Sequence, residues 1–205
     1  MTEDDLDDME FDTLRTGDHV AAARRLSELA GSVSGGVSRA KVLLRAGEQW
    51  QHAGDHEKAA ELYRKAIEDG GEVYGDPRAY LADALFELDR VDEARRLIEE
   101  IRADAPRDPE VHRCVAELLY AYGDLTGAHE WATAGADVVL AIRDRGESVV
   151  QREPGEQEAE DDDLAEALSA EDSLEALLRL RYRARLDLGQ PEDEYDAMLD
   201  DLLKA

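Results

Sequence analysis

The sequence predicts an all-α protein built from antiparallel pairs of short helices, and two observations support this. Between residues 43 and 68, apolar residues recur at steps of three and four on both sides of a break at Gly54-Asp55, which is the spacing of one helical face. The same break, followed by the same face, returns at a nearly constant interval along the 205 residues. Helices of this length are marginally stable alone in water, so each pair must bury its apolar side against its neighbours.

The segment 43–68 contains the best-defined pair. The apolar face of its first helix consists of Leu43, Ala46, Gly47 and Trp50, and that of its second helix consists of Ala59, Leu62, Tyr63, Ala66 and Ile67. Gly54 can adopt the left-handed conformation that ends the first helix. Asp55 can then cap the first turn of the second helix.

This pair resembles the tetratricopeptide repeat, in which large and small residues alternate with aromatic ones around a short turn. The residues that carry the resemblance are Leu43, Ala46, Gly47, Trp50, Gly54, Asp55, Ala59, Tyr63 and Ala66. An ordinary helical hairpin is the alternative, and recurrence of the pattern disfavours it. The resemblance implies a right-handed α-solenoid of antiparallel helix pairs whose first helices line a groove for a peptide.

Four repeats are expected over residues 1–143. One alanine near the start of each second helix marks the register, and these residues lie 37, 35 and 34 residues apart: Ala22, Ala59, Ala94 and Ala128. The interval of the family is about 34 residues. The first repeat is degenerate, and the third turns at Asp89-Arg90 without the usual glycine.

The remainder of the chain departs from the repeat. Residues 144–163 lack helical periodicity and end in an acidic run, a composition that favours a flexible loop. A solvated surface loop and a regulatory acidic tether are both compatible with it. Residues 164–205 regain the helical period and predict a divergent helix pair that completes or caps the solenoid.

The charge of the chain restricts its partners. With 51 acidic and 24 basic residues the formal net charge is −27, which disfavours binding to nucleic acid or to an anionic membrane surface. A protein or peptide with a basic or neutral segment fits better. The single cysteine, Cys114, excludes an intramolecular disulfide, and together with the absence of an apolar N-terminal run it predicts a cytoplasmic protein.

The sequence offers little for catalysis, so we expect no enzymatic activity, no cofactor and no metal. His52 and His56 have the spacing of a helical metal pair, but Gly54-Asp55 interrupts the helix between them. Cys114 has no adjacent group to activate it as a nucleophile. No phosphate-binding glycine loop or calcium loop is present in the sequence.

The resemblance implies a set of residues that face the groove. They are Arg45, Glu48, His52, Tyr80, Asp83, Glu87, Arg113, Glu117, Tyr120, Arg179 and Arg183. Aromatic rings and arginines of this kind suit a peptide ligand, although the same residues could simply be the solvated sides of the first helices. The chain has no asparagine, which argues against the Lys, Arg and Asn clamp that some family members close on a terminal carboxylate.

Three other functions stay open. The protein could be a scaffold that self-associates as a homodimer through its C-terminal pair or the region of Trp131. It could be an acidic mimic of nucleic acid that occupies a basic protein. An enzyme would need a pocket of carboxylates with shifted pKa values, of which the sequence gives no sign.

Overall fold

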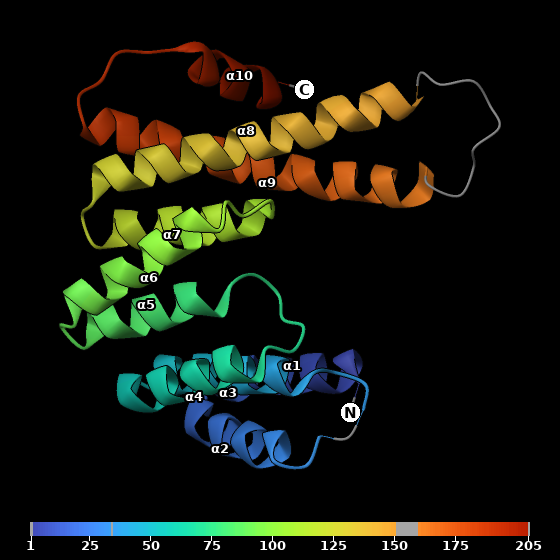
Figure 1. The fold of residues 1–205 in the computed structure, drawn as a ribbon, viewed down its shortest axis with the longest axis vertical. Helices are drawn as coiled ribbons and strands as arrows, with labels where there is room; N and C mark the ends of the chain where they lie inside the picture. Colours follow the sequence, from blue (N-terminus) through green and yellow to red (C-terminus); the bar gives the residue numbers. More distant parts are fainter. Residues whose placement is uncertain (1, 34, 151–159, 205) are drawn as a thin grey trace. The chain divides into compact units, whose positions relative to one another are not determined.

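A computed structural model of the protein describes residues 2–33, 35–150 and 160–204, and every regular element in these ranges is an α-helix (Figure 1). The helices are α1 (Glu3–Thr16), α2 (His19–Ala30), α3 (Arg39–His52), α4 (His56–Asp69), α5 (Pro77–Glu87), α6 (Val91–Ala103), α7 (Pro109–Ala121), α8 (Leu125–Val150), α9 (Glu160–Asp187) and α10 (Glu194–Leu202). The chain divides into two compact units, Met1–Asp104 and Ala105–Ala205. None of the described helices is long and apolar enough to cross a membrane.

In the first unit, α2 to α6 pack each against the next along the chain. The starts of α2 to α5 are fixed by side chains that accept hydrogen bonds from backbone N–H groups otherwise without a helical partner. Ser38 Oγ accepts from Lys41 N at 3.0 Å, Asp55 Oδ1 from Lys58 N at 3.2 Å and Asp76 Oδ1 from Arg78 N at 2.9 Å. The sequential packing of helix pairs predicted for a solenoid is therefore confirmed within this unit.

Small side chains allow the helices of this unit to approach closely. Ala59, Tyr63 and Ala66 on α4 are each at most 1% exposed. Opposite them, a Cβ atom added to Gly47 would lie 2.7 Å from Cδ1 of Tyr63, which is closer than real atoms approach. The small residue predicted at this position is thus required by the tyrosine ring.

The turns of the second and third pairs share one geometry. Gly54 has φ = 78°, and Asp55 N donates to Trp50 O at 2.9 Å. In the third repeat Asp89 takes the same place with φ = 57°, and Arg90 N donates to Leu85 O at 2.8 Å. This hydrogen bond closes the end of a helix in both cases. Aspartate therefore replaces the expected glycine without a change of turn, since Asp tolerates the left-handed region better than most residues.

In the first repeat the buried face of α2 is displaced by one residue from the predicted one, with Ala23 buried in place of Ala22. Ala23, Leu26 and Ala30 of α2 are buried, whereas Ala22 and Leu29 are half-buried. The physical reason is the turn: Gly17 N donates to Thr13 O at 2.7 Å, while Asp18 N donates to the hydroxyl of Thr16. This turn differs from that of the second and third repeats, so a different face of α2 is buried.

The second unit is built on two long helices. α8 packs against both α7 and α9, α7 also contacts α9, and α10 packs on α9. Gly135 makes this packing possible, because a Cβ there would lie 2.7 Å from Cβ of His112 on α7 and 2.8 Å from Cδ2 of Leu177 on α9. Ala128, Ala132 and Ala136 of α8 are fully buried.

The helices reach further into the acidic segment than predicted. α8 continues to Val150 and α9 begins at Glu160, so both ends of the predicted loop 144–163 are helical; residues 151–159 lie outside the described part of the chain. Periodicity fails here, but Glu, Arg and Ala are good helix formers, and adding residues to an existing helix is easier than starting one. The expected boundary at residue 143 falls inside α8 and within the second unit.

Candidate functional site

The expected binding residues of the first unit occupy one side of α3 and one side of α5. Arg45 and Glu48 lie on α3, and Arg45 Nη1 is 3.3 Å from both Glu48 Oε2 and Glu10 Oε2 of α1. Burial raises the pKa of Glu48, and the neighbouring Arg45 opposes that shift. Arg45 and Glu48 therefore form a fixed, half-buried charge pair rather than two free surface charges.

The other members of this group lie at the junction of α3 and α5. Asp83 accepts a hydrogen bond from Gln51 Nε2, and Oε1 of Gln51 accepts one from the Tyr63 hydroxyl at 3.0 Å. The ring of Tyr80 is 5.8 Å from that of Tyr63. Half-buried Tyr80 and Asp83 thus belong to a network that joins three consecutive helices.

The two exposed members of the group, His52 and Glu87, contact side chains of neighbouring helices. The ring of His52 is 5.1 Å from that of His19 on α2, and Glu87 is 3.8 Å from Nε2 of His56. His52 and His56 therefore have different neighbours, and within the described residues no group of three or more His, Cys, Asp or Glu side chains could hold a metal ion.

In the second unit the expected residues fall into two clusters. On α7, Arg113 Nη1 is 2.6 Å from Glu117 Oε1, and the same guanidinium also pairs with Glu110. Between α7 and α9, the hydroxyl of Tyr120 donates to Asp187 Oδ2 at 2.6 Å, and the guanidinium of Arg183 lies 4.9 Å from the ring of Tyr120.

Arg179, on the next turn of α9, pairs only with Glu175 among the contacts described, at 2.6 Å, and is exposed. Cys114 is half-buried beside the Arg113 cluster, and burial raises the pKa of its thiol to about 12. A thiol that stays protonated at neutral pH is a poor nucleophile.

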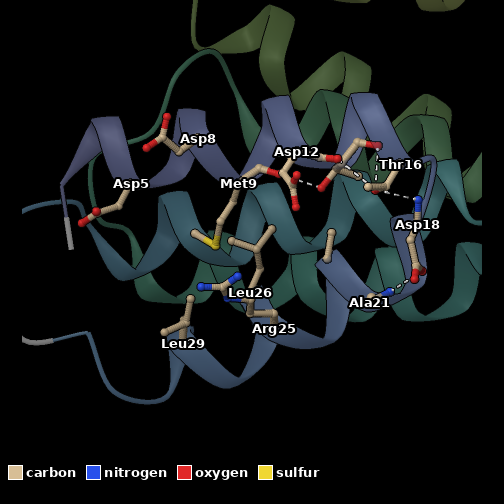
Figure 2. Close-up of a pocket in the computed structure, with 12 residues that line it drawn as sticks. Asp5, Asp8, Met9, Asp12, Thr16, Asp18, Ala21, Arg25, Leu26 and Leu29 are labelled. Carbon is tan, nitrogen blue, oxygen red and sulfur yellow. Dashed lines mark hydrogen bonds between the residues drawn. The ribbon is translucent and has the colours of Figure 1, made fainter.

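A groove between α1 and α2 was not expected from the sequence. It has a volume of about 720 Å³. In Figure 2, Met9 of α1 extends toward Leu26 of α2 across its floor. Four aspartates line it, Asp5, Asp8, Asp12 and Asp18, together with Arg25 as its only basic lining residue among those described. The signal in the sequence was the recurrence of three of these aspartates on one side of a helix; the groove itself depends on the rotated face of α2.

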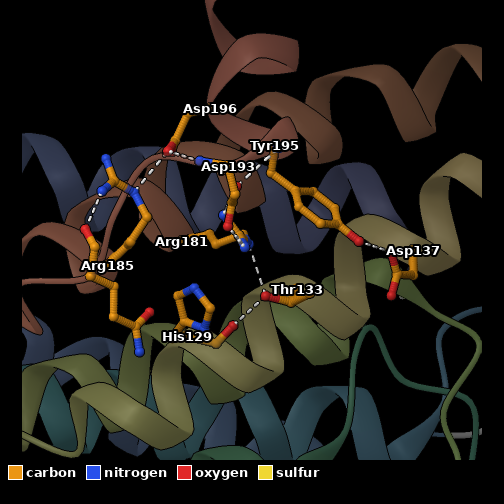
Figure 3. Close-up of polar contacts among 9 residues, drawn as sticks. His129, Thr133, Asp137, Arg181, Arg185, Asp193, Tyr195 and Asp196 are labelled. Carbon is orange, nitrogen blue, oxygen red and sulfur yellow. Dashed lines mark hydrogen bonds and ion pairs between the residues drawn. The ribbon is translucent and has the colours of Figure 1, made fainter.

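A cluster of buried charges in the second unit was also missed (Figure 3). Arg181 and Arg185 of α9 are 4% and 3% exposed. Arg181 pairs with Asp193 at 2.5 Å and Arg185 with Asp196 at 2.8 Å, both at the start of α10. These ion pairs attach α10 to α9.

Comparison with known proteins agrees with this architecture. Residues 51–118 match the family model described as tetratricopeptide repeat. This segment is a tetratricopeptide repeat region. The matched residues run from the end of α3 into α7 and so include the third pair entirely. No curated protein matches the chain.

Tetratricopeptide repeats are in general protein–protein interaction modules, and the matched model describes a repeat rather than a catalytic family. The eleven residues expected to bind a peptide remain a prediction. They are all partly or fully exposed and recur at helical spacing on α3, α5, α7 and α9.

Proposed function

We propose that this tetratricopeptide repeat protein is a non-catalytic adaptor that holds a peptide segment of a partner protein against the sides of its first helices. The observation that supports this most is the repeated composition of these sides. On α5 and again on α7 a tyrosine and carboxylates lie within two helical turns, with partial exposure. Aromatic rings supply apolar contact area, and pre-positioned charges supply orientation.

The peptide is expected to be basic or neutral. Among the expected binding residues of α3 and α5 the charged groups are Arg45, Glu48, Asp83 and Glu87, and Arg45 is already neutralised by Glu48 and Glu10. The excess charge of these expected binding residues is therefore negative. A cationic segment would gain from this field and would associate faster at low ionic strength.

Self-association is the alternative function for which the structure removes one of the expected contact regions, the side chain of Trp131. The side chain of Trp131 is 3% exposed, and its ring lies 5.3 Å from that of His112, so this tryptophan is already covered within one molecule. A homodimer would have to use other residues, such as Leu186 of α9 and Leu203 after α10, which are 51% and 53% exposed.

The test compares two double charge reversals. Glu87→Lys with Glu117→Lys changes exposed carboxylates on first helices, which pair with His56 and Arg113. Glu61→Lys with Glu99→Lys changes exposed carboxylates on the second helices α4 and α6, which pair with Lys65 and Arg102. Affinity capture from the cells that express the protein, with quantitative mass spectrometry, identifies partners that require the first-helix residues.

We expect the first pair of substitutions to reduce capture of the partner about tenfold, since like charges would then oppose a cationic ligand, and the second pair to leave it unchanged. Equal effects of both pairs would contradict the proposal. Circular dichroism melting curves establish that all variants are folded. A particle mass that grows with protein concentration would favour the homodimer instead.

A further inference from the structure

The groove between α1 and α2 lies apart from the first-helix residues proposed above to bind a peptide. We infer that this groove binds a short amphipathic helix of a protein partner, with an apolar stripe flanked by lysine or arginine. The inference extends beyond the proposed function and uses different side chains, so each can fail without the other.

The dimensions of the groove fit one face of a helix. Its volume of about 720 Å³ is within the range of ligand clefts, about 300–1,000 Å³. Along α1 the lining residues recur once per turn from Asp5 to Thr16, which corresponds to roughly 17 Å at 1.5 Å per residue. About three turns of a partner helix can therefore lie along it. Recognition of an amphipathic helix by an apolar groove is a common mode of peptide binding.

The floor of the groove is apolar and incompletely covered. Met9, Ala22 and Leu29 line it, and all three are half-buried rather than buried. In the second repeat the equivalent seam between α3 and α4 is closed, because Ala59 and Tyr63 are fully buried against Gly47. The different turn after Gly17 leaves the first seam open, so apolar surface is available there for a partner.

The rim of the groove is acidic, so the charge on the partner helix should be positive. Asp5 and Asp8 line the groove, are exposed, and have no basic side chain as an ion-pair partner among the described residues. Asp12 is 64% exposed and pairs with Arg15 at 2.7 Å. Lysine or arginine on both sides of an apolar stripe would be attracted to these carboxylates.

A second copy of this chain is a poor occupant. Each copy has a net charge of −27, so two copies repel one another. The most basic stretch of the chain, residues 178–185, contains Arg181 and Arg185, and both are buried in ion pairs with α10. These two arginines are therefore not available to enter the groove of another molecule.

The probe for the test is a fluorescein-labelled synthetic helix of about five turns, made of leucine on one face and lysine on the other. Two control peptides have glutamate in place of lysine, or the same residues in an order without helical period. Binding to the full-length protein is followed by fluorescence anisotropy at about 0.15 M salt, where the Debye length is near 8 Å and diffuse attraction to the acidic surface is weak.

Adjacent residues of α1 provide matched variants. Asp8→Lys changes a carboxylate that lines the groove, and Asp7→Lys makes the same change one residue away, on an exposed position outside the lining. Leu29→Ala removes apolar side-chain surface from the floor of the groove. Leu14→Ala makes the same change at a side chain of α1 that is 73% exposed and lies outside the lining. Melting curves verify that each variant is folded.

We expect the lysine peptide to bind and both control peptides to fail. Asp8→Lys should weaken binding about tenfold and Leu29→Ala about fivefold, while Asp7→Lys and Leu14→Ala change it less than about twofold. Equal effects of Asp7→Lys and Asp8→Lys, absence of binding, or binding of the peptide without helical period would each overturn the inference. So would a dimer that disappears on Asp8→Lys, because the occupant would then be a second copy.

Discussion

At the scale of single residues, two glycines determine how closely neighbouring helices approach. Gly47 faces the ring of Tyr63, and Gly135 lies between His112 and Leu177. The sequence predicted Gly47 as a small residue of the helix-pair seam. It did not predict Gly135, because nothing near that glycine in the chain indicates that two other helices would contact it from both sides.

Replacing Gly47 by alanine should destabilise the first unit by about 1–3 kcal/mol, the usual cost of overpacking a close contact. The added Cβ would lie 2.7 Å from Cδ1 of Tyr63. Chemical denaturation followed by circular dichroism measures the change in the free energy of unfolding. In a double-mutant cycle, Tyr63→Leu should reduce this cost; a cost that is independent of the residue at position 63 would show that the contact is not responsible.

Buried charges are the residues that sequence reasoning could not place. Arginine is rarely buried unless it is paired, so the prediction assigned Arg179 and Arg183 of α9 to the binding face and gave Arg181 and Arg185 no role. In the structure the first two are exposed and the last two are buried. Their partners come from the start of α10, which no local pattern around the arginines reveals.

At the scale of elements, the attachment of α10 illustrates how a short helix is stabilised by its contacts. A helix of nine residues is unstable alone in water. It is held by the pairs of Arg181 with Asp193 and Arg185 with Asp196, and by the hydrogen bond of 2.5 Å from the Tyr195 hydroxyl to Asp137 of α8 (Figure 3). Asp193 is also the residue that caps α10, since its side chain accepts from Tyr195 N at 3.1 Å.

Stability at acidic pH should depend on Asp193. The hydrogen bond with Arg181 holds the pKa of Asp193 below its ordinary value of 3.8. The folded state therefore binds fewer protons at this site than the unfolded state does, so the stabilisation is complete above about pH 4 and is lost as the pH falls through the folded pKa. Asp193→Asn removes the charge while asparagine remains a good helix cap.

We expect Asp193→Asn to lower the melting temperature at pH 6 and to have a smaller effect at pH 3, measured by circular dichroism. Asp200→Asn is the matched control on the same helix. Asp200 is 73% exposed, and its ion pair with Lys204 is long, at 4.0 Å. A deficit of the Asp193 variant that is equal at both pH values would contradict the assignment of the stabilisation to its charge.

The presence of each helix was easier to predict from the sequence than its length. The turns at Gly54 and Asp89 were located from the sequence, and both residues have a positive φ. The ends of α8 and α9 were not located, because the sequence there lacks an apolar helical period although it is helical to Val150 and again from Glu160.

At the scale of the whole molecule, the repeat interval predicted the order of the helix pairs correctly. The division into units was different: the structure separates Met1–Asp104 from Ala105–Ala205, whereas the sequence suggested a boundary after residue 143. α8 and α9 pack on each other and on α7, which places them in one unit with α7. The turn between α1 and α2 has two residues, whereas the turn between α3 and α4 has three; this small difference accompanies the groove between α1 and α2.

The net charge of −27 should make the folded state sensitive to salt. Excess charge of one sign destabilises a compact chain through self-repulsion, and salt screens it. Raising sodium chloride from about 0.01 M to 0.3 M should therefore add about 1 kcal/mol and raise the melting temperature by about 2–4 °C. The same titration near the isoelectric pH is the control, where the rise should disappear. A melting temperature that falls with salt at neutral pH would mean that attractive ion pairs dominate.

The half-buried state of Cys114 has a practical consequence for spectroscopy. Its thiol is the only one in the chain, and burial raises its pKa to about 12, so at neutral pH it reacts slowly with maleimides. A cysteine introduced at an exposed position such as Asp7 would keep an ordinary pKa and would be modified first. A dye or a nitroxide can therefore be attached at one chosen place with the native thiol left in the chain.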